Sequence, residues 1–244
     1  MKKIVISLSL IIAILASCTS VFAEKFEGIG MKINLPEEYY DLKAGIDTND
    51  TKIEFYTALM KITKEDLATE YRQNSVLYNG INSNMANEIY VSTSENQLTK
   101  SIFHLSRATE EQTKQVKDEL EKAAVAQGMK TNKQEVYSKN EITYIYTAMT
   151  KSSLTVYQYY TIVNGTGITI SLHSSDNSAK KDELKKIVDS ITFDELQEKP
   201  ASFTKYILIG VTSMLVIMVL VLMYMAFFSK KNKDDDYEEI DDEE

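Results

Sequence analysis

Residues 154–174, LTVYQYYTIVNGTGITISLHS, contain two runs of β-branched and aromatic residues on either side of Asn164-Gly165. An Asn-Gly pair is the strongest short signal for a two-residue β-hairpin, because a type I′ turn needs positive φ at both central positions. A two-residue turn sets the register, so we expect Val163 to face Thr166 and Tyr159 to face Ile170. This register gives the hairpin one strongly apolar face, which predicts the core of a β-sheet.

The opposite face of the hairpin has a different character. Its expected cross-strand pairs are Tyr160 with Thr169, Gln158 with Ser171, and Val156 with His173. Because these pairs mix polar and apolar side chains, we expect this face of the sheet to be only partly covered.

Further strands are predicted on both sides of the hairpin by alternating and β-branched runs. They cover residues 29–35, 76–81, 88–93, 135–138 and 141–150. Pro36 ends the first strand, and residues 37–49 are expected to form a loop. The order of elements predicts an α+β domain with an antiparallel sheet and helices packed on it.

Three helices are predicted from their capping residues. The capping pairs are Thr63 with Asp66 and Thr109 with Gln112, and Ser178 precedes the third helix. The second helix stops at Gly128 and is the longest of the three. We expect it to bury a stripe formed by Val116, Leu120, Ala123 and Ala124.

Residues 1–23 have the pattern of a secretory signal peptide. Lys2 and Lys3 precede an apolar run, and Val21-Phe22-Ala23 places small residues at the positions that a signal peptidase requires before Glu24. An alternative rests on the stretch Leu15-Ala16-Ser17-Cys18, which resembles the bacterial lipobox. In that case Cys18 is lipidated and becomes the first residue of the mature chain.

Residues 206–228 form an apolar run of 23 residues without a charge. At about 1.5 Å per residue, a helix of this length spans about 34 Å, against about 30 Å for the hydrocarbon core of a bilayer. The run therefore predicts a single transmembrane helix. Lys230, Lys231 and Lys233 follow it directly, so the positive-inside rule places the C-terminus in the cytoplasm.

These two apolar segments divide the chain into five parts. The parts are a signal peptide at 1–23, an extracytoplasmic domain at 24–198, a juxtamembrane linker at 199–205, a transmembrane helix at 206–228 and a cytoplasmic tail at 229–244. Nine of the last eleven residues are acidic, which predicts a disordered, solubilising tail. The alternative is a docking peptide whose hydrophobic contacts are Tyr237 and Ile240.

The composition excludes several classes of function. A single cysteine rules out a disulfide framework and a zinc site built from paired CxxC motifs. A net charge of −9 argues against a nucleic-acid-binding surface. Lysine far outnumbers arginine, which is typical of bacteria with low-GC genomes.

No motif for a cofactor or a metal is complete. Residues 28–30 and 165–167 each begin a dinucleotide-binding motif, but the third glycine is missing from both. The stretch from Asp47 resembles the start of a calcium loop, yet Lys52 and Ala58 stand where glycine and glutamate are required. We therefore expect no bound cofactor and no metal.

His104 and His173 are the two side chains able to act as bases near neutral pH. Ser174, Ser175 and Asp176 follow His173, which leaves a Ser–His hydrolase open. Adjacent residues of a strand point to opposite faces, however, so these neighbours make a poor catalytic triad. We expect no catalytic residue, and the alternative is an envelope hydrolase whose catalytic residues are unassigned.

Two stretches carry a resemblance to a known family. GIGMKINLPEEYY at 28–40 is a strand that ends in proline and aromatics, and KKDELKKIVDSITF at 180–193 is a helix that leads into a short strand. Together they resemble the PsbP-like family of extracytoplasmic domains, which includes the DcrB-like bacterial lipoproteins. The resemblance covers residues 26 to about 196 and implies an α/β/α sandwich, with helices packed on the faces of an antiparallel sheet of about six strands.

Members of that family act mainly as non-catalytic accessory or assembly factors at membranes or larger complexes, and the resemblance implies such a role here. The predicted membrane helix and acidic tail depart from the family pattern, so no functional residue is carried over. Tyr39 and Tyr40 are candidate contacts for a partner, with core packing as the alternative.

The expectation is therefore a single-pass, membrane-anchored module of a bacterial cell envelope. It binds another envelope protein or component on the outer side without catalysis. A sensor that signals through the acidic tail is a further alternative.

Overall fold

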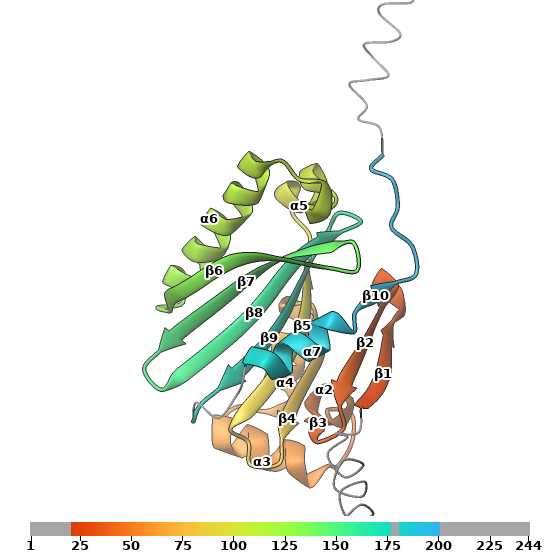
Figure 1. The fold of residues 1–244 in the computed structure, drawn as a ribbon. Coiled ribbons are helices and arrows are strands. Elements are labelled where there is room, and N and C mark those ends of the chain that lie inside the picture. Colours follow the sequence, from red (N-terminus) through yellow and green to blue (C-terminus); the bar gives the residue numbers. More distant parts are fainter. Residues whose placement is uncertain (1–20, 177–180, 201–244) are drawn as a thin grey trace, which may run out of the picture. The chain divides into compact units, whose positions relative to one another are not determined.

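The computed structural model describes residues 21–176 and 181–200 of the chain. The chain divides into two units, residues 1–199 and 200–244, and apart from Pro200 every described residue belongs to the first. The first unit is an α+β domain built on two antiparallel sheets (Figure 1). The predicted fold class is confirmed at this level.

Seven strands form the larger sheet in the order β3-β4-β5-β9-β8-β7-β6. Their bounds are β3 Tyr39–Asp41, β4 Val76–Asn82, β5 Asn87–Ser94, β6 Lys130–Lys139, β7 Ile142–Lys151, β8 Leu154–Val163 and β9 Thr166–Ser174. The six longer strands are the predicted ones, whereas β3 lies in the segment predicted as loop, where Tyr40 pairs with Ile81. A strand of three residues is too short to show an alternating pattern in the sequence.

A separate sheet of three strands has the order β1-β2-β10. Its bounds are β1 Val21–Phe26, β2 Met31–Pro36 and β10 Thr192–Phe193. β2 is the predicted first strand, and its alternation places Met31, Ile33 and Leu35 in the core at 1% exposure or less. The single predicted sheet is therefore two sheets.

Six α-helices and two short 3₁₀ turns are present among the described residues. Their bounds are α2 Leu42–Gly45, α3 Thr51–Met60, α4 Lys64–Gln73, α5 Gln97–Ile102, α6 Glu110–Ala126, α7 Lys181–Asp189, η1 Glu27–Ile29 and η2 Leu105–Arg107. Thr63 and Thr109 both form the predicted capping boxes at the starts of α4 and α6. Ser178 lies outside the described residues.

The helices α2, α3 and α5 are absent from the sequence prediction. Asp41 is the N-cap of α2, and its side chain accepts hydrogen bonds from the backbone amides of Lys43 and Ala44. In α3, Phe55 and Leu59 are more than half exposed while Ile53 is fully buried. Apolar residues on both faces hide the one-sided stripe by which an amphipathic helix is recognised.

The apolar face of the hairpin forms the main core, as predicted. Val163 pairs with Thr166 and Tyr159 pairs with Ile170, so the predicted register is confirmed. This face is covered by α7 and by the three-stranded sheet (Figure 1). It therefore carries one helix and a second sheet, where the sequence predicts helices alone.

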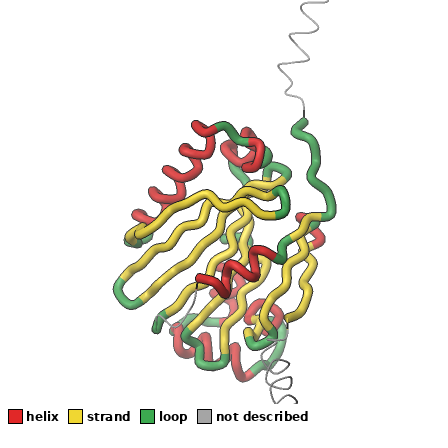
Figure 2. The backbone as a smooth tube through the Cα atoms, viewed as in Figure 1, coloured by secondary structure: helices red, strands yellow, loops and turns green. Residues whose placement is uncertain are grey.

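Two groups of helices lie at opposite ends of the other face (Figure 1). One group, α2 to α4, builds a small core over β4 that includes Leu42, Ile53 and Leu67. The other group, α5 and α6, packs Ile102 and Val116 over β7 and β8. The long strands β6 to β9 extend between the two groups of helices (Figure 2). On this face, the strands β5 and β9 carry polar side chains.

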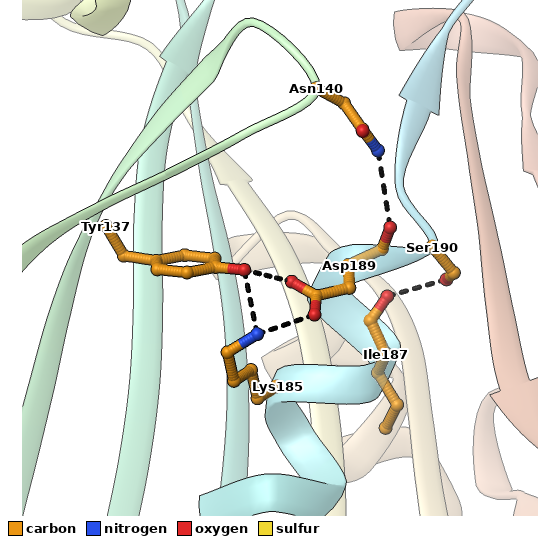
Figure 3. Close-up of polar contacts among 6 residues, drawn as sticks. All are labelled: Tyr137, Asn140, Lys185, Ile187, Asp189 and Ser190. Atoms are coloured by element: carbon orange, nitrogen blue, oxygen red, sulfur yellow. Dashed lines mark hydrogen bonds and ion pairs between the residues drawn. The ribbon is translucent and has the colours of Figure 1, made fainter.

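The helix α7 is tied to β6 by a polar network (Figure 3). The Tyr137 hydroxyl donates to Asp189, and Lys185 Nζ donates both to that hydroxyl at 2.9 Å and to Asp189 Oδ2 at 2.6 Å. Asn140 Nδ2 donates to the Asp189 backbone carbonyl at 3.3 Å. Because these polar groups are hydrogen-bonded to one another, we interpret the network as structural: it fixes α7 against β6.

The Asn164-Gly165 turn has positive φ at both positions, 53° and 80°, as a type I′ turn requires. The side chain of Asn164 also bonds the segment that follows β10. Asn164 Nδ2 donates to the Glu195 carbonyl at 3.0 Å, and the Gln197 amide donates to Asn164 Oδ1 at 2.9 Å. The Gly165 amide donates to the Phe103 carbonyl at 2.9 Å.

Gly165→Ala is expected to lower the free energy of unfolding by about 1–3 kcal/mol, because a side chain is strained at positive φ. The new Cβ would also lie 3.2 Å from Phe103 Cδ2. Urea unfolding of the full chain in detergent micelles, followed by tyrosine fluorescence, measures the change. Gly28→Ala is the control, since a Cβ there meets nothing within 4 Å. Equal unfolding midpoints for the two variants would contradict the prediction.

Candidate binding groove

The central strands of the larger sheet carry polar side chains on the face between the two helical groups. Cross-strand partners share a face, so β5, β9 and β8 place Tyr90, Ser171 and Gln158 side by side. Two residues along each strand, the next row is Ser92, Thr169 and Tyr160. The polar strip, as we call this surface, consists of Tyr90, Ser92, Gln158, Thr169, Ser171 and His173.

The predicted polar pairs of the hairpin are all present in the ladder between β8 and β9. Gln158, Thr169 and His173 are partly exposed. The expectation that this face is only partly covered is therefore confirmed.

A groove of about 580 Å³ opens where the polar strip meets α5 and α6. Gln158, Tyr160 and Thr169 form its floor. One wall comes from α6 and its C-cap residue, with Gln115, Val116, Glu119, Leu120, Ala123 and Gln127. The other wall comes from the end of β5 and the start of α5, with Ser94, Asn96, Gln97 and Leu98.

The groove is rich in carboxamide side chains. Among the described residues, the side-chain amides of Gln97, Gln115, Gln127 and Gln158 make no hydrogen bond. Each amide offers two N–H donors and a carbonyl acceptor. A polar ligand without charge would therefore find donors and acceptors on the floor and on both walls.

The predicted buried stripe of α6 differs from the observed one at the residues that border the groove. Val116 and Ala124 are buried, at 2% and 5% exposure, as expected. Leu120 is half-buried, however, and Ala123 is exposed and lines the groove. The helix contacts the sheet along a narrower line than its sequence suggests, which leaves the side with Ala123 open.

His173 contacts the serine two residues before it. Its Nε2 lies 3.0 Å from Ser171 Oγ, and its ring lies against Tyr90 with centroids 5.0 Å apart. Burial lowers the pKa of His173 to about 4, so the ring is neutral at physiological pH. Ser174 Oγ instead donates to Asp176 Oδ1 at 3.1 Å. The i, i+2 spacing places both side chains on one face of the strand, a signal for this pair that is present in the sequence but absent from the prediction.

Directly across the ladder from this histidine, Glu88 is held by neutral donors. Tyr56 Oη donates to Glu88 Oε1 at 2.9 Å, and Asn79 Nδ2 donates to the same oxygen at 3.1 Å. Tyr71 donates in turn to Asn79 Oδ1. Burial raises the pKa of Glu88 above its usual range, and the hydrogen bonds only partly oppose that effect. The cluster links α3, α4 and the sheet at one end of the polar strip.

His104, the other candidate base, is 3% exposed. Its Nε2 lies 2.7 Å from the Gln197 carbonyl, and its ring meets Phe103 edge-on. A carbonyl can only accept, so Nε2 carries the proton in this contact. The side chain tethers the segment before Pro200.

The two predicted partner contacts near the start of the domain differ in exposure. Tyr39 is 5% exposed, and its hydroxyl donates to Glu183 Oε1 on α7 at 2.8 Å. Tyr40 is half-buried and donates to Asp50, while Lys52 Nζ lies 4.5 Å above its ring. Burial raises the pKa of Tyr40 to about 12. Tyr39 therefore packs in the core, which was the alternative to a partner contact. A partner contact by Tyr40 stays a prediction.

Several predicted features lie outside the described residues. They are Cys18, Tyr237, Ile240, the apolar run at 206–228 and the acidic tail. Within residues 21–176 and 181–200, no helix is long and apolar enough to cross a membrane.

The predicted signal-peptide boundary falls inside a strand. Val21–Ala23 form the first half of β1, and the ring of Phe22 lies 6.5 Å from that of Tyr78. Cleavage before Glu24 would leave Glu24–Phe26 to pair with β2.

The stretch that resembled a calcium loop leads into α3 instead. Asp50 Oδ1 accepts a hydrogen bond from the Lys52 amide at 2.8 Å and so caps that helix. Across the part of the chain that the structure describes, no three His, Cys, Asp or Glu side chains are grouped so that they could hold a metal ion.

The fold and the groove together define an α+β sandwich domain with one partly open, polar sheet face. No protein-family profile and no curated protein matches the sequence. Among solved structures, the chain is similar to cyanobacterial PsbP (CyanoP) from Synechocystis sp. PCC 6803, with 10% identity, a TM-score of 0.46, and coverage of 72% of this chain and 94% of that one.

Two other solved structures are similar to the chain. The Ran-binding protein Mog1p of Saccharomyces cerevisiae shows 9% identity and a TM-score of 0.44, with coverage of 72% of this chain and 96% of that one. A protein from Bacteroides thetaiotaomicron shows 8% identity and a TM-score of 0.32, with coverage of 74% and 53%. The fold-level resemblance to PsbP expected from the sequence is confirmed, and it extends to the fold alone.

Proposed function

We propose that this chain is a single-pass membrane protein of a bacterial cell envelope, whose extracytoplasmic domain binds another envelope protein or component without catalysis. The apolar runs at 1–23 and 206–228 support the membrane anchoring and the orientation. The groove between α6 and the polar strip supports the binding role.

The observation that carries the proposal is the set of unpaired amides in that groove. These amides are exposed or half-buried, so they bond water and remain accessible to a ligand. Gln115 on α6, Gln127 at its C-cap and Gln158 on the floor line one concave surface and, within the described residues, make no side-chain hydrogen bond. Such groups are ready to bond a ligand.

The chemistry of the groove supports binding without catalysis. Apart from the phenol of Tyr160, its one titratable side chain is Glu119, whose Oε1 accepts from Lys122 at 2.8 Å. The contact between Ser171 and His173 has the spacing of a nucleophile and a base. Ser171 is 4% exposed, however, so its hydroxyl offers almost no surface to a substrate.

Photocrosslinking in intact cells tests the proposal. The full chain is made with p-benzoylphenylalanine in place of Gln127 or Ala123, and adducts are identified by mass spectrometry after irradiation. We expect the same discrete adduct from both groove positions. The control position is Gln73, which is exposed on α4 and lies outside the groove.

Two results would count against a binding role for the groove. One is the absence of a reproducible adduct from either groove position when the chain is present at its normal level. The other is an identical set of adducts from Gln73, which would show that the contacts follow exposure alone.

A further inference from the structure

The groove carries almost no free charge. Its one carboxylate, Glu119, is exposed and paired with Lys122 on the next turn of α6. The remaining lining groups are amides, hydroxyls and aliphatic side chains. A charged group that left water for this surface would lose its hydration without gaining a partner of opposite charge. The groove therefore suits a neutral ligand.

The spacing along α6 matches an extended polypeptide. Gln115, Glu119, Ala123 and Gln127 line the groove at every fourth residue. Four residues of an α-helix rise about 6 Å, and two residues of an extended chain span about 6.6 Å. The whole wall from Gln115 to Gln127 is about 18 Å long, which corresponds to about five extended residues.

The amides also match the chemistry of a peptide backbone. A carboxamide holds its acceptor and donors side by side, and so can bond the C=O and N–H of one extended residue. Between the amides, Leu98 and Leu120 are half-buried and offer apolar contact to alternate side chains. A sugar ring would need an open aromatic face, whereas Tyr160 is 8% exposed and its hydroxyl is hydrogen-bonded to Ser94.

From these observations we infer that the groove binds an extended, uncharged segment of a partner polypeptide, about five residues long, mainly through the segment's backbone. This inference rests on the proposed binding function and names the chemistry of its ligand. The lack of a free charge among the lining residues then selects against charged segments, and the amides set the register of the bound chain.

Panning of phage-displayed random dodecapeptides against the full chain in detergent micelles tests the inference. We expect enrichment of neutral peptides. A synthetic copy of an enriched peptide should bind the double variant Gln115→Leu/Gln127→Leu at least about tenfold more weakly, and Gln158→Leu should weaken it as well. Gln73→Leu is the matched control and should leave the affinity unchanged, and urea unfolding of each variant reports its folding.

An N-methyl scan of that peptide separates backbone recognition from side-chain recognition. Because backbone groups on one side of an extended chain recur every two residues, N-methylation should abolish binding at alternate positions. Uniform tolerance of N-methylation, or equal loss of affinity in Gln73→Leu and in the groove variants, would overturn the inference. Binding of an oligosaccharide that is lost in the groove variants, with no peptide enriched, would also overturn it.

The two experiments fail in distinguishable ways. An adduct from Gln127 in cells, together with failure of the peptides, would leave the groove as a binding site for another kind of ligand. Absence of adducts from both groove positions would remove the binding function itself.

Discussion

Tyr159→Ala is expected to lower the free energy of unfolding by about 3–5 kcal/mol, the range for removing a buried aromatic ring. Tyr159 is 1% exposed, and its ring centroid lies 5.0 Å from that of Tyr146 and 5.6 Å from that of Tyr137. Each such pair contributes about 0.5–1.5 kcal/mol beyond the burial of its area. Because Tyr137 also bonds α7, the loss should extend to the docking of that helix. Urea unfolding of the full chain measures the change.

Tyr159→Phe is the matched control for this prediction. It keeps the ring, and the hydroxyl of Tyr159 makes no hydrogen bond among the described residues, so we expect a loss below about 1 kcal/mol. A loss of the same size in both variants would show that the hydroxyl, rather than the ring, holds the core together. A loss below about 1 kcal/mol in Tyr159→Ala would contradict the placement of this tyrosine in the main core.

The second large effect is a loss of stability at acid pH caused by His173. Its pKa is about 4 in the folded chain because burial disfavours the charged ring, whereas the pKa of a histidine in water is about 6.5. Between these two values the unfolded chain binds a proton that the folded chain does not. Stability therefore falls as the pH decreases from about 6.5 to about 4, by about 3 kcal/mol in total.

Comparison with His173→Phe isolates this contribution. Phenylalanine keeps a ring against Tyr90 but cannot take up a proton, so the wild type should lose about 3 kcal/mol more than this variant between pH 7 and pH 4. The neighbouring Glu88 has a raised pKa and acts in the opposite direction, and it is present in both chains. Urea titrations at a series of pH values measure the difference. Parallel curves for the two chains would contradict the neutral state of the histidine.

Because of the polar strip, the central strands of the larger sheet are apolar on one face only. Its hydroxyls, amide and imidazole lie between two helical groups that each build their own small core. Ser171 and Glu88 are bonded within the strip or at its end, so they strengthen the sheet, whereas Gln158 faces the groove without a side-chain partner among the described residues. We expect the ligand-binding groups to be those that the fold leaves unsatisfied.

Local signals were sufficient for the elements that depend on neighbours in sequence. The turn at Asn164-Gly165, the register of its hairpin and the capping boxes of Thr63 and Thr109 all arise from contacts over a few residues. The helix α3 escaped prediction because its apolar residues face both the core and the surface. The strand β3 escaped because its pairing partner, β4, lies about forty residues further along the chain.

The sequence by itself determined the hairpin, its apolar and polar faces, the class of the fold and the two apolar runs at the ends of the chain. These follow from turn geometry, from the two-residue period of a strand and from hydropathy, none of which requires knowledge of distant contacts. Only the tertiary structure decided that α6 stands away from the sheet on the side of Ala123, that four amides converge there, and that His173 is neutral. These properties depend on which elements cover which part of a face, and that is settled by packing between residues far apart in the chain.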